Sequence, residues 1–416
     1  MTASHVPRSA PQAAATASHR MTADERRASL SMAAIFALRM LGLFMVLPVF
    51  ALEAAKLPGG NDPALIGLAM GVYGLTQALM QVPLGLASDR FGRKKIIVLG
   101  LVVFALGSLL AALADSVQML AVGRAVQGAG AISAAVTALL ADLTRDEVRT
   151  KGMALVGISI GLTFALSLMA APPLAGAIGL SGLFWLTAAL ALIGIGVVLG
   201  ITPAEPARHA DMPRGKLSDV WLHPQLWRLD LGVFVLHTVQ MAMWGVVPAL
   251  LLQAGLPKAE HWHVYLPAVG ASFVLLGGLF ALERRGQLRL VLRGSVALLV
   301  VVQLGLLALA PRQPGLWALG IALFGFFIAF NVLEASQPSL ISRLAPAHAR
   351  GAALGVYNTL QSLGLFAGGA LGGLALKAWG PTGVFAATSV LALLWLLLGW
   401  GQAVPPPAAT AQPTAR

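Results

Sequence analysis

The sequence predicts an all-α membrane protein in which twelve transmembrane helices form two similar six-helix bundles. Three observations support this fold class: the composition, the length of the apolar runs and the placement of the basic residues. The chain is 58% hydrophobic and only 11% charged, with a mean hydropathy of +0.82, whereas soluble domains carry about 25% charged residues. The apolar runs between charges reach roughly 18 to 26 residues, which is the length that crosses a bilayer as a helix.

Twelve apolar segments follow one another along the chain. The first six lie at 30–52, 64–87, 96–114, 119–141, 153–178 and 183–201. The second six lie at 229–252, 264–282, 290–310, 316–341, 352–375 and 383–401. Each segment is predicted to cross the membrane once.

These segments divide the chain into two bundles with polar ends. Residues 1–28 are rich in Ala, Ser and Pro and have no apolar core, which predicts a disordered tail and not a signal peptide. We expect an N-terminal bundle at 29–201, a linker at 202–228, a C-terminal bundle at 229–402 and a second tail at 403–416.

The basic residues predict the orientation in the membrane. With the N-terminal tail inside, most of the 28 Lys and Arg fall in the tails and the inner loops. The exceptions are four residues on the other side and two within helices: Lys56, Lys258, Arg312 and Lys377, then Arg39 and Arg124. Because Lys and Arg concentrate in cytoplasmic loops, we expect a multi-pass membrane protein with both termini and the linker cytoplasmic. The net charge of +12 then needs no nucleic-acid partner.

The two halves resemble each other weakly. Asp89-Arg90-Phe91-Gly92 is echoed by Glu283-Arg284-Arg285-Gly286 at the matching loop of the second half, and Lys151-Gly152 is echoed by Arg350-Gly351. Parallel six-helix repeats suit transport by alternating access, because two similar bundles can rock about a site between them.

Nothing in the sequence predicts a cofactor, a metal site or an enzyme. The absence of cysteine excludes thiolate ligands, disulfides and catalytic thiols. His261 and His263 are the only close pair of histidines and lie in a predicted loop. The Gly-x-Gly pairs lie within apolar helices, without the context of a nucleotide site.

A charged stretch from Gly85 to Lys95 separates the second and third apolar segments. Its plainest interpretation is a hairpin loop that basic residues hold at the cytoplasmic face. However, the order Gly85-x-x-x-Asp89-Arg90-x-Gly92-Arg93-Lys94 resembles the signature that transporters of the major facilitator superfamily carry between helices two and three.

Further phrases resemble the YajR-type branch of the proton-coupled drug efflux transporters of bacterial inner membranes within this superfamily, which implies that the chain lies in an inner membrane. They are Leu38-Arg39-Met40-Leu41-Gly42, Tyr73-Gly74-Leu75-Thr76-Gln77 and Ala141-Asp142-Leu143-Thr144-Arg145. The resemblance covers about residues 20 to 402. The YajR type also carries a small soluble domain after helix twelve, which we do not expect in the Pro/Ala-rich stretch 403–416.

The resemblance implies a conformational lock at the cytoplasmic face. Asp89 is expected to dock on the start of helix eleven near Ala352 and to pair with Arg93, which also meets Asp142. This set would hold the halves together while the cavity faces outward. The residues assigned to the lock are Gly85, Asp89, Arg90, Gly92, Arg93 and Asp142.

Three charged residues within helices are candidates for proton coupling: Glu334, Arg124 and Arg39. Charged side chains inside a membrane span are costly and usually functional. Arg124, in Arg124-x-x-Gln127-Gly128, resembles a superfamily signature whose arginine is linked to proton movement; the alternative is that Arg124 extends to the outer interface. Arg39 either holds an anionic group or structures the inner half of the cavity. Glu334 is expected to be the only acid well inside a span, with a salt bridge to an inner-loop base as the alternative to proton binding.

Other polar and aromatic positions are candidates for a substrate cavity. They are Tyr73, Gln77, Gln81, Gln127, His237, Gln240, Trp244, Asn331, Tyr357, Asn358 and Gln361. In helix five, the superfamily's drug antiporters carry Gly-Pro-x-x-Gly-Gly, whereas this chain has Ala171-Pro172-Pro173-Leu174-Ala175-Gly176, which weakens the antiporter assignment. Gly364, Gly368 and Gly372 predict close helix packing in helix eleven.

The leading functional interpretation is proton-coupled export of small hydrophobic or cationic compounds. The expected partners are a small-molecule substrate, protons and the lipid bilayer. One alternative is uptake by symport of a sugar or organic acid, with Arg39 as the counter-charge. Another is a sensor or lipid-handling protein that binds without transport.

Overall fold

A computed structural model describes residues 20–205, 220, 223–346 and 349–402, and every element in these ranges is a helix. The first half holds α1 (Ala23–Ala54), α2 (Pro63–Phe91), α3 (Arg93–Ala112), α4 (Val117–Ala129), α5 (Ser133–Asp142) and α6 (Asp146–Gly200). The second holds α8 (Pro224–Gln253), η1 (Lys258–Glu260), α9 (Trp262–Leu282), η2 (Glu283–Gln287), α10 (Leu288–Leu309), η3 (Ala310–Arg312), α11 (Leu316–Leu344) and α12 (Arg350–Gly399).

Ten stretches of the described residues are long and apolar enough to cross a membrane. Those in α6 and α12 contain 54 and 50 residues, or about 75–80 Å as straight helices, against a hydrocarbon layer of about 30 Å. Each turns at a glycine with positive φ, Gly179 at 67° and Gly380 at 64°. Both stretches therefore hold two crossings, and the prediction of twelve transmembrane helices is confirmed.

Several predicted boundaries were wrong. α1 begins at Ala23, inside the stretch predicted as a tail, because Thr22 and Glu25 form a reciprocal capping box. Residues 1–19 of that predicted tail and residues 403–416 lie outside the described part. α8 begins at Pro224, inside the predicted linker, and residues 206–219 and 221–222 of the linker are not described.

The charged stretch that begins at Gly85 is helical as far as Phe91, and was wrongly predicted as a loop. The turn between α2 and α3 consists of Gly92 alone, with φ 114° and ψ 135°, a conformation that side chains with a Cβ rarely adopt. The predicted fourth helix is also interrupted, between α4 and α5. There a Cβ on Gly130 would lie only 2.3 Å from the carbonyl oxygen of Gly100 in α3.

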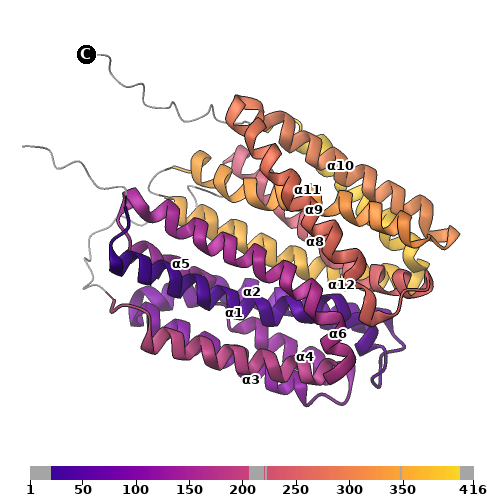
Figure 1. Cartoon of the computed structure of the whole chain (residues 1–416), viewed down its shortest axis with the longest axis horizontal. Coiled ribbons are helices and arrows are strands. Elements are labelled where there is room, and N and C mark those ends of the chain that lie inside the picture. Colours follow the sequence, from indigo (N-terminus) through magenta and orange to yellow (C-terminus); the bar gives the residue numbers. More distant parts are fainter. Residues whose placement is uncertain (1–19, 206–219, 221–222, 347–348, 403–416) are drawn as a thin grey trace, which may run out of the picture.

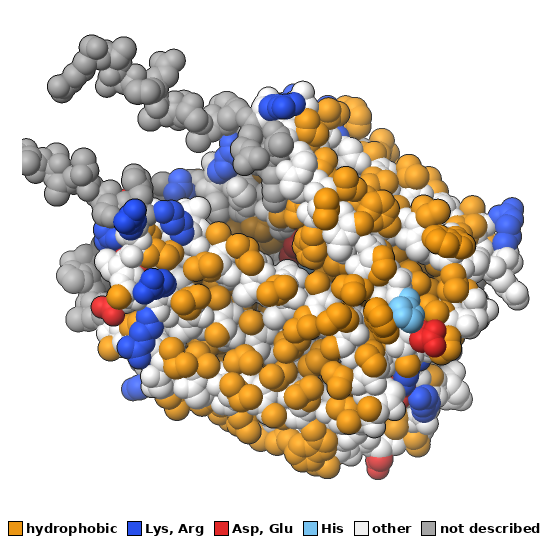
Figure 2. Space-filling model, viewed as in Figure 1, with side chains coloured by type: hydrophobic (Ala, Val, Ile, Leu, Met, Phe, Trp, Pro, Cys, Tyr) orange, Lys and Arg blue, Asp and Glu red, His pale blue; other side chains and the backbone are white. Residues whose placement is uncertain are grey.

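The two halves lie side by side with their helices along the long axis of the molecule (Figure 1). We call the end that carries the start of α1, the Gly92 turn and the end of α12 the basic end. The end with the Gly179 and Gly380 turns is the opposite end. Lys and Arg gather mainly at the basic end, and hydrophobic side chains cover the middle of the visible face (Figure 2).

Exposed tryptophans mark both ends of this apolar surface. Trp227 and Trp400 are 53% and 56% exposed near the basic end, and Trp317 and Trp379 are 88% and 73% exposed near the opposite end. Tryptophan is enriched where a membrane meets water. The molecule therefore has the surface of a multi-pass membrane protein.

The halves share a hydrophobic core only towards the opposite end. There the second part of α1, including Val46 and Phe50, belongs to one cluster with residues of α8 and α11 such as Val239 and Phe327. Towards the basic end, the N-terminal half has a separate core around Phe36, which contains no described residue of the other half. The surface between the halves is hollowed on the side of the basic end (Figure 2).

Glycines bring α2 and α12 into backbone contact across the two halves. A Cβ on Gly67 would lie 2.2 Å from the carbonyl oxygen of Gly369, and one on Gly71 would lie 2.7 Å from that of Phe366. Small residues at such spacing let membrane helices approach closely. The predicted stripe of Gly364, Gly368 and Gly372 is confirmed as a packing surface: it lies on another side of α12, against Phe234, Thr238 and Ala242 of α8.

An arginine near the start of each half closes its ring of helices. Arg27 donates from Nε to the carbonyl oxygen of Ile201, just after α6, at 2.7 Å. In the same way, Arg228 donates from Nη1 to that of Gly401, just after α12, at 2.7 Å. A cation at a helix C-terminus is favourable because the last carbonyls lack partners within the helix.

The glycine contact yields a test of how the halves are joined. We expect Gly67→Ala to lower stability by about 1–3 kcal/mol, because the added methyl overpacks the contact. Gly196→Ala is the matched control, since a Cβ at this exposed helical position meets nothing within 4 Å. Thermal unfolding of both variants in detergent should separate them, and equal midpoints would contradict the close contact.

Candidate functional site

A buried arginine of α1 anchors a polar cluster in the N-terminal half. Arg39 is 1% exposed. It donates from Nη2 to the hydroxyl oxygen of Tyr73 at 2.8 Å and to Oε1 of Gln77 at 3.2 Å. Its guanidinium also lies 5.3 Å from the centre of the Phe104 ring. Neutral oxygens and an aromatic ring therefore surround this cation, and its Nε and Nη1 find no hydrogen-bond partner among the described residues.

Arg124 of α4 lies on the other side of Tyr73. Its Nη1 donates to Oε1 of Gln127 at 2.5 Å, and Gln127 donates in turn to Ser108 at 2.8 Å. The guanidinium lies 4.7 Å from the centre of the Tyr73 ring, so Tyr73 contacts both arginines. Arg124 is 1% exposed, so the alternative that it extends to the outer interface is wrong.

The C-terminal half brings Glu334, Gln361 and His237 together. Gln361 Nε2 lies 3.0 Å from Oε1 of Glu334 and 2.8 Å from Nε2 of His237. His237 Nδ1 lies 3.0 Å from the carbonyl oxygen of Val233. These contacts fit a neutral imidazole that donates from Nδ1 and accepts at Nε2. The second carboxylate oxygen of Glu334 is 3.5 Å from His237 Nε2, and no described Lys or Arg of the inner loops pairs with this acid.

A second acid inside the C-terminal half was missed. The prediction that Glu334 is the only acid well within a span is wrong, because α8 starts earlier than expected and places Asp230 almost two turns inside it. Asp230 is 5% exposed, and its Oδ1 has no partner among the described residues. Tyr357 lies within electrostatic range of both acids, and its hydroxyl is 3.4 Å from Oε1 of Gln337.

One hydrogen bond joins the two polar clusters across the halves. Gln77 Nε2 donates to the hydroxyl of Ser362 at 2.9 Å, one residue after Gln361. A continuous polar path therefore runs from Arg39 through Gln77 to the part of α12 that contacts Glu334.

The remaining cavity candidates do not form a single lining. Asn331 donates to Ser272 at 2.8 Å, and the Trp244 ring packs against that of Tyr265 at 5.5 Å. Gln81 and Gln240 are 2% and 6% exposed, and the amide atoms of Gln81 have no described partner. Asn358 is half-buried on the same helix as Gln361.

The structure brings three of the predicted lock residues together. Arg93 Nη1 lies 2.5 Å from Asp89, and Arg93 Nε lies 3.2 Å from Asp142. Arg90 is exposed and stacks on Phe91, and a Cβ on Gly85 would make only an ordinary contact with Ala134. Docking of Asp89 on α12 near Ala352 stays a prediction.

A carboxylate from the linker caps α3 beside this ion pair. Glu205 accepts from the backbone N–H groups of Arg93 at 3.1 Å and Lys94 at 2.5 Å. The Lys94 ammonium group donates to the carbonyl oxygen of Thr202 at 2.6 Å. An acid at a helix N-terminus is favourable, and no role was predicted for Glu205 from the sequence.

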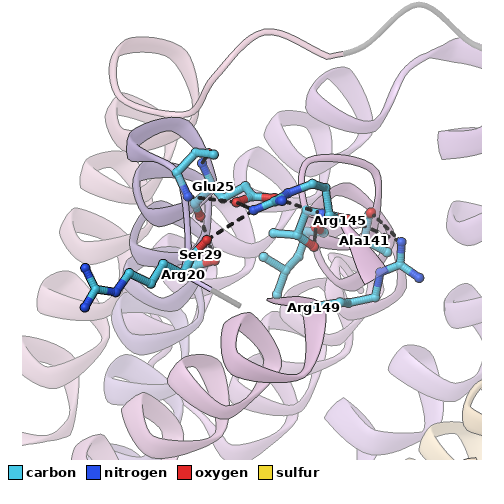
Figure 3. A network of polar contacts seen from close by, with 9 residues as sticks. Arg20, Glu25, Ser29, Ala141, Arg145 and Arg149 are labelled. Carbon is cyan, nitrogen blue, oxygen red and sulfur yellow. Dashed lines mark hydrogen bonds and ion pairs between the residues drawn. The ribbon is translucent and has the colours of Figure 1, made fainter. Parts of the chain in front are cut away.

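A second ion pair ties the start of α1 to the connection between α5 and α6 (Figure 3). Arg145 donates from Nε and Nη2 to the two carboxylate oxygens of Glu25, at 2.7 and 3.0 Å. Its backbone N–H also donates to Glu25, at 3.1 Å. Arg149 donates to the carbonyl oxygens of Ala141 and Thr144, so both arginines hold the connection that carries Asp142.

At the opposite end, ion pairs join the two halves directly. The Lys258 ammonium group pairs with Glu53 of α1. Lys377 lies 2.9 Å from Asp62, and this ammonium group lowers the pKa of Asp62. These contacts between the halves lie at the opposite end or near the middle, whereas the surface between the halves is hollowed on the side of the basic end (Figure 2).

The two histidines that lie close in the sequence have different surroundings. His261 is buried and its Nε2 contacts the carbonyl oxygen of Leu256 at 3.2 Å, whereas His263 is half exposed. Within the described ranges, no group of three His, Asp or Glu side chains could hold a metal ion.

The family model of the Major Facilitator Superfamily matches residues 32–369. The chain belongs to this superfamily. Its members among the similar proteins include the inner membrane transport protein YajR of Escherichia coli (strain K12), which is 43% identical over 93% of this chain and 86% of its own length. Multidrug resistance protein 2 of Bacillus subtilis (strain 168) is 26% identical over 80% of this chain and 85% of its own length.

Solved structures of superfamily members share the fold. A mutant of the nucleoside transporter NupG matches with a TM-score of 0.70 over 89% of this chain and 98% of its own, at 13% identity. The human organic anion transporter MFSD10 matches with a TM-score of 0.68 over 91% of this chain and 100% of its own, at 20% identity. The predicted resemblance to the superfamily and to the YajR type is confirmed, and the chain is a transporter of this superfamily and not an enzyme.

The two arginines that share Tyr73 suggest a test of their packing. Tyr73→Phe removes the hydroxyl that accepts from Arg39, so a buried cation loses a partner, and we expect stability to fall by about 1–3 kcal/mol. Tyr265→Phe is the control, because the buried Tyr265 hydroxyl has no partner among the described residues, and its loss should cost less. Thermal unfolding would contradict this account if both variants shifted equally.

Proposed function

We propose that this chain exports small hydrophobic or cationic compounds across the inner membrane in exchange for protons. The observation that carries the proposal is Glu334, an acid in the middle of α11, in contact with Gln361 and His237. Its side chain is 37% exposed, as expected for a group that water reaches from the hollow on the side of the basic end (Figure 2). The names of two relatives support the proposal: the E. coli protein is an inner membrane transport protein, and the B. subtilis protein is a multidrug resistance protein.

The basic end would face the cytoplasm, with both termini on that side. The clustering of Lys and Arg at this end supports the orientation. In this orientation the structure is open to the cytoplasm and closed by the Lys258–Glu53 and Lys377–Asp62 pairs towards the outside.

Glu334 would alternate between a proton and the substrate. As a carboxylate it accepts from Gln361 Nε2, and a cationic or polarisable substrate nearby would favour this form. Protonation from outside would remove the charge and release the substrate. Each ligand must change the affinity for the other equally, and this linkage couples export to proton entry.

Uptake of a sugar or organic acid has less support. That alternative uses Arg39 as the substrate's counter-charge, yet Arg39 is 1% exposed and lies behind Tyr73 and Gln77. Its surroundings favour a structural cation that shapes the cavity wall. Sensing without transport has no specific support from the site.

Glu334→Gln tests the proton site. In inside-out vesicles with an acidic interior, we expect addition of tetraphenylphosphonium to dissipate the pH gradient for the parent protein and not for Glu334→Gln, which keeps the shape but cannot release a proton. The variant should still bind the cation, with an affinity that no longer depends on pH. Glu260→Gln, an exposed acid in η1, is the control. If Glu334→Gln exchanges as well as the parent, the proton site lies elsewhere, and Asp230→Asn tests the second acid of this half. If the substrate instead acidifies the vesicle interior, the protein is a symporter.

The ion pairs at the two ends predict opposite shifts in conformation. The chain has no cysteine, so Asn358→Cys creates a single labelling site in the half-buried part of α12. We expect Asp89→Asn to increase labelling from the basic end, because it weakens the lock of the outward-facing state. Asp62→Asn should decrease it, because it weakens the Lys377 pair that closes the opposite end. Unchanged labelling in both variants would reject control by these pairs.

A further inference from the structure

A pocket lies at the basic end of the C-terminal half, between α8, α10, α11 and the end of α12. It encloses about 50 Å³, well below the roughly 300–1,000 Å³ of small-molecule sites, so only a small group can enter it. Arg228, Arg289 and Arg293 line its polar side, and Leu292 and Trp395 belong to its apolar wall. None of the described residues that line it is acidic. Three arginines therefore line one pocket that has no acidic residue in its described lining.

These arginines retain donors for a ligand. Arg228 uses Nη1 for the carbonyl oxygen of Gly401, and Arg293 uses Nη2 for that of Trp400 while it stacks on the Trp400 ring. A guanidinium has five N–H donors, so each keeps several. Arg289 is exposed and has no hydrogen bond or ion pair within the described ranges. The pocket is thus suited to an anion that accepts several hydrogen bonds, such as a phosphate group.

The pocket sits where lipid headgroups lie. It is formed by the starts of α8 and α10 and the end of α12, and the exposed Trp227 and Trp400 mark the membrane–water boundary here. Just below, Leu290 and Leu397 are 64% and 71% exposed on the outer faces of α10 and α12. A phospholipid would place its phosphate in the pocket and its acyl chains along these faces. Basic pockets between transmembrane helices bind such headgroups.

The N-terminal half provides a comparison. Its related recess, between the start of α1 and the end of α6, is lined by Arg26 and Arg27 but by no third arginine. Arg27 already donates to the carbonyl oxygens of both Gly200 and Ile201. Of these two recesses, only the one in the C-terminal half is lined by three arginines.

We propose that this pocket binds the headgroup of an anionic phospholipid. The inference does not use the transported substrate or proton coupling, because none of the three arginines belongs to the polar clusters around Glu334 and Arg39. Binding there would hold the helices α8, α10 and α12 together at the basic end. One phosphate would contact Arg228 of α8 and Arg293 of α10, and both arginines donate to carbonyl oxygens at the end of α12.

Native mass spectrometry of the full chain in non-ionic detergent tests the proposal. We expect phosphatidylglycerol to bind about tenfold more tightly than phosphatidylcholine with the same acyl chains, because each nearby basic residue adds to the attraction. Arg289→Gln should weaken binding of phosphatidylglycerol about three- to tenfold and leave that of phosphatidylcholine unchanged, whereas Arg289→Lys should weaken it less. Arg285→Gln is the matched control, as an exposed arginine of the same end that does not line the pocket.

Thermal unfolding distinguishes a lipid from a soluble anion. Phosphatidylglycerol should raise the midpoint of the parent protein and raise that of Arg289→Gln less. Inorganic phosphate and glycerophosphoglycerol, at the same concentration, should have no such effect. Equal stabilisation by inorganic phosphate would overturn the proposal in favour of a soluble anion site. Equal binding of the two lipids, or equal losses in Arg289→Gln and Arg285→Gln, would also overturn it.

Discussion

The backbone contact between α2 and α12 is the constraint on which the rest of the structure depends. Because Gly67 and Gly71 carry no Cβ, the backbones of the two helices are in direct contact. This contact fixes the relative position of the two halves along the helix axes. It places Gln77 within reach of Ser362 and brings Lys377 to Asp62. The halves can thus separate at the basic end while the opposite end stays joined.

The two halves carry charges of opposite sign within their helices. The N-terminal half holds cations, Arg39 and Arg124, and both rest against Tyr73. The C-terminal half holds acids, Glu334 and Asp230, near Tyr357. Related bundles have therefore acquired opposite intramembrane charge, so the space between them is polarised. Such a field orients a dipolar or cationic molecule before it contacts any particular side chain.

The fold was largely predictable from the sequence, and the contacts within the site were not. Apolar runs and basic loops are local features, so twelve helices and their arrangement in two bundles could be deduced. The position of Arg39 in an apolar segment predicts a buried charge. It does not predict that Arg39 donates hydrogen bonds to Tyr73 and Gln77, because those contacts depend on how the helices pack. Asp230 was missed since its burial depends on where α8 begins, and helix starts are the least certain part of a sequence-based prediction. The spacing of Gly67 and Gly71 was a usable signal for the contact with α12, although it was overlooked. Nothing local could indicate that Glu205 caps α3, more than a hundred residues away.

The arginines that close each bundle also bear on how the protein is made. Arg27 lies near the start of the first helix, and its acceptors, Gly200 and Ile201, follow the last helix of the same half. The ring of the N-terminal half can therefore be complete once residue 201 has left the ribosome, before α8 has emerged from it. The first half can assemble as a finished unit during translation and then offer the Gly67 surface of α2 as a template on which the second half docks.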